Sequence, residues 1–552
     1  MPVRLDRREL LSGLAVAPLL GRSGPARAAP SGAFAHGVAS GDPAADSVVL
    51  WTRVSVPVLR VDVRWEVADR EDFSRPVAAG TLVTGPDRDH TVKVVVAGLE
   101  PGRRYCYRFH AAGETSPTGW TRTLPRGRLE SLGIALASCS NHPFGFFNAY
   151  AAIAEDPEVA FVLHLGDYIY EYGPDGYGGR VGAGIGRVPS PPHEIVSLAD
   201  YRRRHAQYKA DAGSRAMHAA HPLIAIWDDH ESANNPWMGG AENHQPDTEG
   251  DWHDRRAASL QAYYEWMPIR EPGPGGSPAA YWRHFEFGDL ASLVTLETRH
   301  TGRSRQIEYD DHPAALTSAA AAAAFRREVL GAPDRAMLAP ELETFVAASL
   351  ADSVRAGRPW RLLGNQIPMA RVHVPPLDGE LPGWSADASD PTSDHRARLA
   401  ALGRFDLPIY LDTWDGYPAA RERLYARCRE VGATDLLVLT GDSHSFWTNA
   451  LRDGAGRPMG LEIGTAGITS PGDFEAFGPE GAARMDELLM RHNDEVLWTD
   501  NRHQGYVRLV LGRAAARVDV VAVDRIDVPR YRTRLLHREQ IVRRDEVLEF
   551  TG

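Results

Sequence analysis

The hydrophobic and polar positions of the chain follow two different patterns, which change near residue 130. Between residues 34 and 126, short segments of alternating apolar and polar residues are separated by frequent turns, one of them at Pro101-Gly102. Four segments have the length and alternation of antiparallel strands: 47–53, 61–67, 90–96 and 105–111. This pattern predicts a small all-β sandwich domain over residues 34–126.

After residue 130 the pattern changes to apolar strands that alternate with helical segments, and it continues to about residue 511. Helices are expected at 146–154, 199–217, 252–266, 340–356 and 419–431. Two further strands are expected at 507–511 and 518–523. The alternation predicts an α/β domain over residues 130–525, with a layered β-sheet core and flanking helices, followed by a C-terminal tail at 526–552.

Four apolar strands of this region end in side chains that bind metals. The strand at 161–165 is followed by Asp167 and Tyr170, and the strand that begins at Leu132 ends at Cys139. The other two strands run into Asp228-Asp-His-Glu231 and Asp442-Ser-His444. If these strands are parallel neighbours in one sheet, their carboxyl ends deliver all these groups to one point. For a single segment the alternative is that Asp167 caps a turn and Tyr170 packs in the core.

A long segment beside this edge is rich in glycine and proline. It covers residues 173–192 and follows Tyr172, and it carries a second phenol at Tyr177. Because such segments form surface loops rather than helices or strands, we expect it to form part of the rim of a pocket.

The first 28 residues have the pattern of an export signal. Arg7-Arg8 precedes an apolar run of small residues to Leu20, and Ala26-Arg-Ala28 offers a cleavage site. Paired arginines indicate the twin-arginine export machinery, and hence a secreted or periplasmic location. The alternative is a basic tail without fixed structure. No later segment of the sequence is long and apolar enough to be expected to span a bilayer.

Composition narrows the class of protein. The chain has 552 residues and a formal net charge of -12, with no long basic stripe, which argues against nucleic acid as a binding partner. Only three cysteines occur, so no disulfide framework is expected. A Cys106–Cys428 pair stays open, whereas Cys139 lies among polar residues and is expected to remain available to a metal.

Seven blocks of sequence, in order, resemble the PhoD-type alkaline phosphatases and phosphodiesterases. They are Gly37-Val-Ala-Ser-Gly-Asp-Pro43, Val49-Leu-Trp-Thr-Arg53, His164-Leu-Gly-Asp-Tyr-Ile-Tyr-Glu171, Ile226-Trp-Asp-Asp-His-Glu231, Leu363-Gly-Asn-Gln366, Trp414-Asp-Gly-Tyr-Pro418 and Thr440-Gly-Asp-Ser-His-Ser-Phe-Trp447. The resemblance implies a fibronectin-like amino-terminal β-sandwich followed by a metallophosphoesterase domain. It also implies twin-arginine export, iron(III) and calcium as cofactors, and phosphate mono- and diesters as small-molecule substrates.

The resemblance also implies which residues hold the two metals. Iron(III) would be bound by Cys139, Asp167, Tyr170 and His444. Asp167 would bridge to calcium, which Asp229 and Asp442 would also bind. The residue chemistry is consistent with this division, because thiolate, phenolate and imidazole suit iron, whereas calcium takes oxygen ligands. Further amide oxygens for calcium could come from Asn234, Asn235 and Asn365.

Two residues are expected to act on the substrate. His230 is placed to donate a proton to the leaving oxygen, and the alternative is that it only orients Asp229. Arg299 resembles the phosphate-binding arginine of the family and has the fork that phosphate needs, whereas the alternative is a solvated surface arginine. The family's usual Asp-Thr-Arg segment is here Glu297-Thr-Arg299, which leaves the substrate contacts less defined than the metal ligands.

Three functions follow from these observations. The first is an exported phosphomonoesterase of the alkaline phosphatase D type. The second is a phosphodiesterase or phospholipase D-like enzyme, because the same ligand set would serve both reactions. The third is a calcium-binding extracellular module without turnover. The sequence disfavours the third, because a thiol, phenol and imidazole together are not needed for calcium binding alone, whereas the ligand set does not distinguish the first two.

Overall fold

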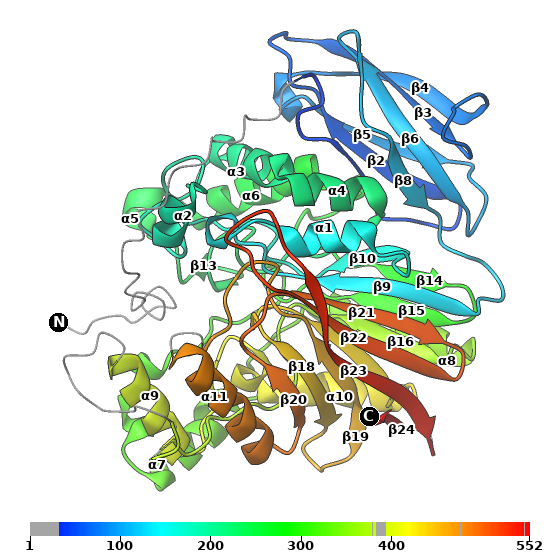
Figure 1. The fold of residues 1–552 in the computed structure, drawn as a ribbon. Helices are drawn as coiled ribbons and strands as arrows, with labels where there is room; N and C mark the ends of the chain where they lie inside the picture. The colour runs from blue at the N-terminus through cyan, green and yellow to red at the C-terminus, as the bar shows by residue number, and fades with distance from the viewer. Residues whose placement is uncertain (1–31, 378, 382–392, 475–476, 546, 552) are drawn as a thin grey trace.

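The computed structural model describes residues 32–377, 379–381, 393–474, 477–545 and 547–551 (Figure 1). The predicted export signal at 1–28 lies outside these residues. The described part of the chain mixes β-sheets and helices, with an all-β region at its N-terminal end, as the sequence predicts. Among the described residues, no helix has both the length and the apolar character needed to cross a membrane.

The N-terminal region consists of two facing sheets. The first holds β1 (Val38–Gly41), β2 (Ser47–Arg53) and β5 (Thr91–Ala97). The second holds β3 (Val61–Ala68), β4 (Pro76–Thr84), β6 (Arg104–Ala111), β7 (Glu114–Thr115) and β8 (Gly119–Arg122). All four expected strands are present, but β4 was not expected, because its Pro-Val-Ala-Ala-Gly start is poor in strand-forming residues.

Strand β2 is buried on both faces and connects this region to the rest of the chain. Leu50 packs between the two N-terminal sheets, whereas the neighbouring Trp51 points to the opposite face and packs against Trp266. The indole Nε1 of Trp51 also donates to the Glu265 carbonyl at 2.8 Å. In addition, β1 pairs in parallel with β11 through Gly41 and Leu223, so the first N-terminal sheet is continuous with a larger one.

That larger sheet has ten strands, in the order β24-β23-β22-β21-β9-β10-β11-β1-β2-β5. Its central strands β9, β10 and β11 are parallel neighbours, with His164 of β10 paired to Ala137 of β9 and Ala225 of β11. The seven members not yet described are β9 (Ser131–Ala137), β10 (Phe161–His164), β11 (Leu223–Ala225), β21 (Gly505–Gly512), β22 (Ala515–Val523), β23 (Thr533–Arg544) and β24 (Val547–Thr551).

A second sheet of seven strands, in the order β14-β15-β16-β17-β19-β18-β20, packs against the first. Its strands are β14 (His284–Phe287), β15 (Ala291–Thr295), β16 (Trp360–Gly364), β17 (Leu436–Thr440), β18 (Phe446–Arg452), β19 (Pro458–Gly464) and β20 (Val496–Asp500). One buried cluster joins Leu136 and Leu163 of the ten-stranded sheet to Leu437 and Ile463 of this one. The condition that all four strands share one sheet therefore holds for β9, β10 and β11 but not for β17, because an apolar run does not reveal which sheet it joins.

Helices cover both outer faces of this pair of sheets. On the side of the ten-stranded sheet lie α1, α3, α4 and α6, which Figure 1 shows between the N-terminal region and the sheet. Helices α8 and α10 contribute Leu342 and Leu424 to a cluster on the seven-stranded sheet. The helices are α1 (Asn148–Glu155), α2 (Gly179–Ile185), α3 (Leu198–Ala210), α4 (Ala212–Ala220), α5 (Pro246–Glu249), α6 (Trp252–Trp266), α7 (Ala319–Ala324), α8 (Pro340–Arg355), α9 (Ser393–Arg404), α10 (Pro418–Glu430) and α11 (Gly478–His492).

The helix expected at 199–217 is in fact two helices. Asp211 ends α3 with an extended backbone, and its side chain then accepts hydrogen bonds from the backbone N–H groups of Gly213 and Ser214. An aspartate followed by small residues is a strong helix N-terminal cap, so it starts α4 rather than continuing α3.

A two-strand ribbon, β12 (Pro236–Trp237) with β13 (Gly240–Ala241), also follows β11.

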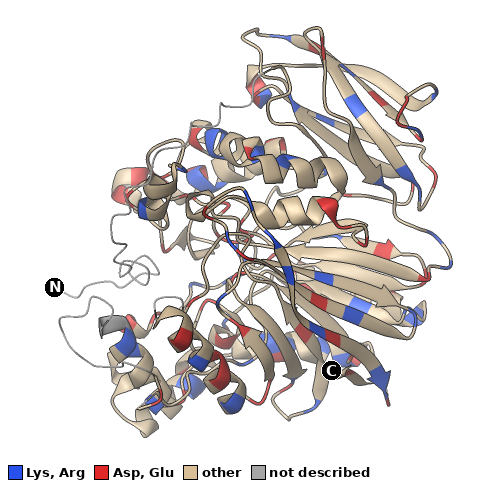
Figure 2. Ribbon diagram, viewed as in Figure 1, with Lys and Arg blue, Asp and Glu red and all other residues tan. Residues whose placement is uncertain are grey.

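Residues of the predicted C-terminal tail form the outer strands β23 and β24 of the ten-stranded sheet. The charged residues coloured on these strands are arginines and glutamates (Figure 2). Asp519 of β22, for example, accepts hydrogen bonds from Arg508, Arg517 and Arg538 at 2.6, 3.0 and 2.5 Å. Arg538, Arg543 and Arg544 of this edge are thus paired with carboxylates, whereas Arg534 contacts His503.

The cysteines are all free and buried. Cys106 donates to the Ala68 carbonyl at 3.4 Å in the N-terminal region, whereas Cys428 packs in the cluster of α8 and α10. The Cys106–Cys428 disulfide that the sequence leaves open is therefore not formed.

Candidate metal centre

The metal-type residues lie in tight turns at the carboxyl ends of strands from both sheets. Cys139 follows β9, Asp167 follows β10, and Asp442 and His444 follow β17. All four have left-handed backbones, with φ of 58°, 56°, 61° and 56°. This conformation costs a non-glycine residue on the order of 1 kcal/mol, and such strain is concentrated at functional sites.

Two glycines allow these turns to approach one another. Gly166 has φ of 101°, and a Cβ at this position would lie 2.4 Å from the Cβ of Asp228. A Cβ on Gly441 would lie 2.2 Å from the Ser138 hydroxyl, so the turn after β17 touches the turn after β9. Because no side chain fits at either contact, glycine is what lets the ends of the two sheets converge on one point.

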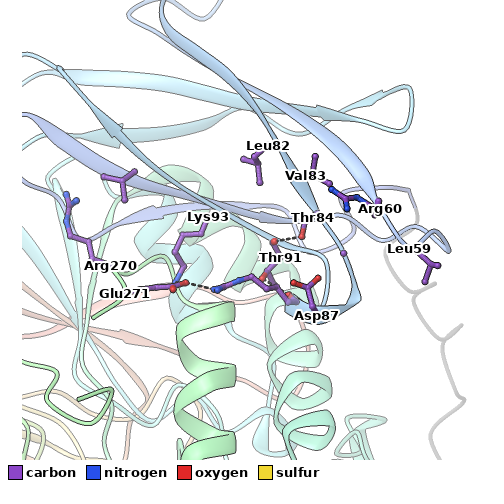
Figure 3. A pocket seen from close by; sticks show the side chains of 13 residues that line it. Leu59, Arg60, Leu82, Val83, Thr84, Asp87, Thr91, Lys93, Arg270 and Glu271 are labelled. Atoms are coloured by element: carbon purple, nitrogen blue, oxygen red, sulfur yellow. Dashed lines mark hydrogen bonds and ion pairs between the residues drawn. The ribbon is translucent and has the colours of Figure 1, made fainter. Parts of the chain in front are cut away.

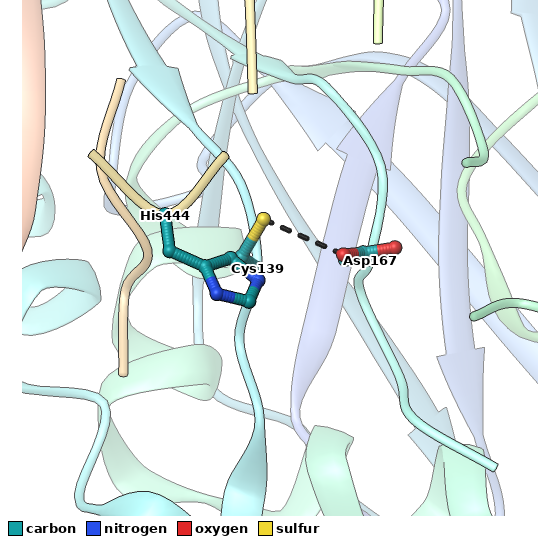
Figure 4. Close-up of side chains that lie close together, drawn as sticks. All are labelled: Cys139, Asp167 and His444. Atoms are coloured by element: carbon teal, nitrogen blue, oxygen red, sulfur yellow. Dashed lines mark hydrogen bonds between the residues drawn. The ribbon is translucent and has the colours of Figure 1, made fainter. Parts of the chain in front are cut away.

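The first group at this point consists of Cys139, Asp167 and His444 (Figure 4). The Cys139 thiol lies 3.4 Å from Asp167 Oδ2, and the Tyr170 hydroxyl donates to the same oxygen at 3.0 Å. Tyr170 also lies 3.3 Å from His444 Nε2 and is almost fully buried. The Tyr170 hydroxyl thus lies at the same point as the thiol, the carboxylate and the imidazole.

The tautomer of His444 is set by the backbone. Its Nδ1 lies 3.0 Å from the Pro471 carbonyl, which can only accept a hydrogen bond. Nδ1 therefore carries the proton, and Nε2 presents its lone pair to the group of Cys139, Asp167 and Tyr170. A histidine held in this way is oriented as metal-binding histidines usually are.

The second group consists of four carboxylates: Asp167, Asp228, Asp229 and Asp442. Asp167 belongs to both groups, so one carboxylate connects the thiol-containing side to the all-oxygen side. Asp228 is a member that the sequence analysis did not select. Its position inside the Asp228-Asp-His-Glu231 block was the available signal.

Arg299 lies against these carboxylates and is fully buried. Its Nε donates to Asp228 Oδ1 at 2.5 Å, and its Nη2 lies 3.6 Å from Asp442 Oδ1 and 3.9 Å from Asp229 Oδ1. The alternative of a solvated surface arginine is therefore excluded. Neither Nη atom has a hydrogen-bond partner among the described residues, although Nη2 is within ion-pair distance of Asp442 and Asp229.

The acidic groups of the centre have raised pKa values, and bound cations would lower them. Burial raises the pKa of Asp167 well above its ordinary value; His230 opposes this effect, and Asp229 and Asp228 add to it. Burial, and then the Asp167 carboxylate, likewise raise the pKa values of the Cys139 thiol and the Tyr170 phenol. Deprotonating these groups together in a dry site requires compensating positive charge, which metal ions would supply.

Several buried oxygen atoms near the centre also indicate a bound cation. Asp167 Oδ1, Asp228 Oδ2, Asn234 Oδ1 and Asn235 Oδ1 have no hydrogen-bond partner among the described residues. A buried polar atom without a partner costs about 1–3 kcal/mol, so groups of them indicate a missing ligand. The residues present thus fit a metal on grounds of both charge and unsatisfied oxygen atoms.

Two glutamates hold the centre in place, and the sequence analysis missed both. Glu231 accepts from the backbone N–H groups of Asp167, Tyr168 and Asp228 at 3.1, 2.6 and 2.8 Å, so it ties the turns after β10 and β11 together. Glu171 accepts from the backbone N–H of Asn234 at 2.8 Å. Both glutamates stand at the ends of blocks that the sequence analysis quoted, but nothing in their spacing indicated these contacts.

His230 lies beside the first group, with its ring 4.2 Å from the Tyr170 ring. Its Nδ1 is 2.7 Å from Glu171 Oε2, whereas only its backbone N–H contacts Asp229 Oδ1, at 3.0 Å. Burial lowers the pKa of His230, but Asp229, Glu171 and Asp167 outweigh this effect and place the pKa well above its ordinary value. Cations bound at Asp167 and Asp229 would oppose that rise.

The three asparagines differ in their surroundings. Asn234 and Asn235 follow the turn after β11, and the Asn235 backbone N–H donates to Asp229 Oδ2 at 2.9 Å. The Asn365 amide instead donates to the Ile367 carbonyl at 2.6 Å, and its oxygen accepts from the Trp414 indole at 3.3 Å. Asn235 thus contacts a carboxylate of the centre through its backbone, whereas the Asn234 amide donates to Glu242 at 2.8 Å and Asn365 has other partners.

One cavity in the described part of the chain lies away from this centre. It has a volume of about 850 Å³ and lies between the N-terminal sheets and the segment after α6 (Figure 3). Lys93, Arg88 and Glu271 line it, and Glu271 is ion-paired to both cations. None of the metal-type side chains lines this cavity.

Two facing sheets bring carboxylates, a thiol, a phenol and an imidazole to one edge, and a buried arginine lies beside them. This arrangement is that of a metal-dependent phosphoesterase. The PhoD-like phosphatase family matches residues 134–520, and the N-terminal domain of PhoD-like phosphatases matches residues 21–125. The chain belongs to the PhoD-like phosphatase family and is a phosphoric ester hydrolase.

Two relatives illustrate this membership. The chain is 36% identical to alkaline phosphatase D of Bacillus subtilis (strain 168) over 491 residues, which cover 86% of this chain and 75% of the relative. A solved structure of PhoD superposes with a TM-score of 0.75 at 31% identity, covering 96% of this chain and 94% of that one. The α/β class predicted from the sequence is confirmed by this match.

Proposed function

We propose that the chain hydrolyses phosphate monoesters in an extracytoplasmic compartment, using iron(III) and calcium held side by side, and that diesters are slower substrates. The observation that supports this most is the sharing of Asp167 between two groups of buried ligands. One group contains the thiol of Cys139 and the imidazole of His444, which suit iron(III), and the other offers only carboxylates, which suit calcium.

The residues divide between the ions as follows. Cys139, Asp167, Tyr170 and His444 would hold iron, and Asp167, Asp229 and Asp442 would hold calcium, with Asn234 as an amide donor. Asn365 stays a predicted calcium ligand, although its side chain has other partners in the structure. When bound, the two ions supply Lewis acidity toward the phosphoryl group and toward the attacking water.

Arg299 is proposed to bind the phosphoryl group. Its Nε is held by Asp228, which orients the guanidinium, while its two Nη atoms remain available to an anion. Two parallel N–H donors match two phosphoryl oxygens and lie in a dry site, where charge stabilisation is strong. An Arg299→Lys variant that binds inorganic phosphate as tightly as the wild type would contradict this role.

His230 is proposed to donate a proton to the leaving oxygen. The Glu171 carboxylate accepts from Nδ1–H, which fixes the tautomer, and protonation at Nε2 then creates the acid that faces away from Glu171. The alternative role, in which the ring orients Asp229, is not decided by these contacts: the ring hydrogen-bonds to Glu171, and a ring nitrogen also lies within 4.8 Å of carboxylate oxygens of Asp167 and Asp229.

The colour of the protein tests Tyr170 as an iron ligand. A phenolate bound to iron(III) gives a visible charge-transfer band, so we expect the purified protein to be purple or blue. Tyr170→Phe should abolish the band, because Phe offers no donor atom, while Tyr168→Phe, two residues earlier in the chain, should retain it. The measurement is the visible absorption spectrum, with iron analysis of the same samples. A band that persists in Tyr170→Phe would contradict the assignment of Tyr170 as an iron ligand.

Export by the twin-arginine machinery is proposed from Arg7-Arg8 and the apolar run that follows. Replacing both arginines by lysine preserves the charge but removes the recognition motif. We expect the precursor of this variant to accumulate in the cytoplasm, while the wild type is processed and exported. Fractionation with an antibody against the protein is the measurement, and unchanged export of the variant would refute the proposal.

Turnover of matched esters tests the proposed substrate class. The metal-loaded protein is assayed on an aryl phosphate monoester and on the corresponding diester, side by side. A higher kcat/KM for the monoester supports a phosphatase. A higher value for the diester would replace this conclusion with the phosphodiesterase alternative, which the ligand set equally permits.

A further inference from the structure

The segment of residues 468–471, which follows β19 of the seven-stranded sheet, runs beside the turn that carries Cys139. The backbone N–H groups of Thr469 and Ser470 donate to the Cys139 carbonyl at 3.4 and 3.2 Å. The Thr469 hydroxyl donates to the Asn141 carbonyl at 2.7 Å, so side chain and backbone hold the segment to the same turn. The segment therefore ties the turn after β9, in the ten-stranded sheet, to the seven-stranded sheet at the candidate metal centre.

Two consecutive residues of this segment contact further proposed iron ligands. The hydroxyl of Ser470, which is fully buried, lies 2.8 Å from the Tyr170 hydroxyl. The next residue, Pro471, accepts from His444 Nδ1 through its carbonyl at 3.0 Å. Together with the contact to the Cys139 carbonyl, the segment touches three of the four residues proposed to hold iron. Groups that hydrogen-bond to metal ligands in this way fix the orientation of those ligands.

The direction of the hydrogen bond between Ser470 and Tyr170 follows from the other neighbours of the phenol. A phenol has one proton, and that of Tyr170 is donated to Asp167 Oδ2 at 3.0 Å. His444 Nε2 lies 3.3 Å from the phenol oxygen and carries no proton, so it can donate nothing to that oxygen. The Ser470 hydroxyl is therefore the donor, and the Tyr170 oxygen accepts from it.

We propose that Ser470 is a positioning residue of the metal centre, whose hydroxyl donates to the Tyr170 oxygen and holds it toward the other iron ligands. As an iron ligand this oxygen would be a phenolate, and a hydrogen bond to a charged oxygen is stronger than one to a neutral oxygen. Ser470 thus stabilises the ligand in its charged form. The inference deepens the proposed function and rests on it, because it assumes that Tyr170 binds iron.

Ser470→Ala removes the donor and leaves the backbone contacts of the segment in place. A hydrogen bond to the phenolate lowers the energy of the electrons that give the charge-transfer band. In the iron-loaded protein, the variant should therefore absorb at longer wavelength, by on the order of 20 nm, for the loss of one hydrogen bond to a charged group. Its iron affinity, measured by competition with a chelator, should fall about 10- to 100-fold.

Ser140→Ala is the matched control. Ser140 is also fully buried and is the neighbour of Cys139, but its hydroxyl donates to the Tyr168 carbonyl at 2.8 Å rather than to the side chain of a proposed ligand. The control should keep the band position and the iron affinity of the wild type. A shift of the same size in both variants would mean that any buried hydroxyl near the centre has this effect, and would overturn the inference.

The metal-free protein provides a test that does not depend on iron. Ser470→Ala should lower the midpoint of thermal unfolding in the wild-type background, because the Tyr170 oxygen loses a donor. In the Tyr170→Phe background it should not, because the serine hydroxyl has already lost its acceptor there, and removal of both partners of a hydrogen bond is close to neutral.

The outcomes separate the inference from the proposed function. The inference is overturned if Ser470→Ala leaves the band and the iron affinity unchanged, or if it lowers the thermal midpoint equally in both backgrounds. A wild-type protein that binds iron without a charge-transfer band would instead overturn Tyr170 as an iron ligand, and with it the role of Ser470 toward iron. The comparison in the metal-free protein is independent of that result.

Discussion

Replacing Asp167 by asparagine is expected to lower kcat/KM for a phosphate monoester by about 10³-fold or more. Asp167 is the only residue shared by the thiol-containing group and the carboxylate group, and one of its oxygens has no partner within the described chain. The amide retains the shape but loses the negative charge, so it can neither offset nor bridge two cations. Elemental analysis should show loss of calcium together with loss of, or weakened binding of, iron.

Asp156→Asn is the matched control for this variant. Asp156 is also buried, but it accepts from Tyr506 and Arg508, at 2.7 Å each, and it belongs to none of the groups of metal-type residues. Its replacement should reduce the free energy of unfolding by about 1–3 kcal/mol and leave the metal content unchanged. If Asp167→Asn kept both metals and near wild-type turnover, Asp167 could not be the bridge.

His230→Gln should reduce hydrolysis of an alkyl phosphate monoester by about 10²-fold or more, the usual contribution of a general acid. Alkoxides are poor leaving groups and need a proton in the transition state, whereas a nitrophenolate leaves without one. The same variant should therefore lose much less activity on a nitrophenyl ester. Steady-state kinetics on a series of leaving groups, with metal analysis, measures the difference as a steeper dependence on leaving-group pKa.

The control for His230→Gln is His221→Gln. In the wild type the His221 ring hydrogen-bonds to the Ile153 carbonyl at 3.0 Å. This variant should leave the leaving-group dependence unchanged. A different result for His230→Gln would favour the alternative role: an equal loss on alkyl and aryl esters, with reduced calcium content, would mean that His230 orients Asp229 rather than donating a proton.

Much of the site could be predicted because its residues follow strands. Apolar runs ending in Cys139, Asp167 and Asp229 indicated one sheet edge, and β9, β10 and β11 are indeed parallel neighbours there. The turn after β17 arrives from the other sheet. Strand pattern reports burial but not the sheet to which a strand belongs, so the convergence was foreseen and its architecture was not.

The residues that the sequence analysis missed act through the backbone. Glu231 and Glu171 hold N–H groups of turns that are distant in sequence, and such contacts leave no periodic signal. Arg299 could be placed in a functional block but not shown to be buried, because burial of a charged residue depends on tertiary partners. The division of the expected helix 199–217 into α3 and α4, in contrast, could have been predicted, because Asp211 followed by small residues is a helix-capping signal.

The proposed cofactors rest on chemistry that composition alone does not fix. Thiol, phenol and imidazole donors favour iron(III), but which ion binds depends on how close together the donors are held as well as on their type. The sequence lists the donors, whereas the distances among Cys139, Asp167, Tyr170 and His444 come only from the fold.

The most direct test of the two-metal account is elemental analysis of the purified, exported protein together with its turnover of a phosphate monoester. The account predicts one iron per chain with at least one calcium, and activity that is lost on removing calcium by a chelator and regained on adding it back. Full activity in protein that contains no iron would contradict the account, and so would activity that does not change when calcium is removed.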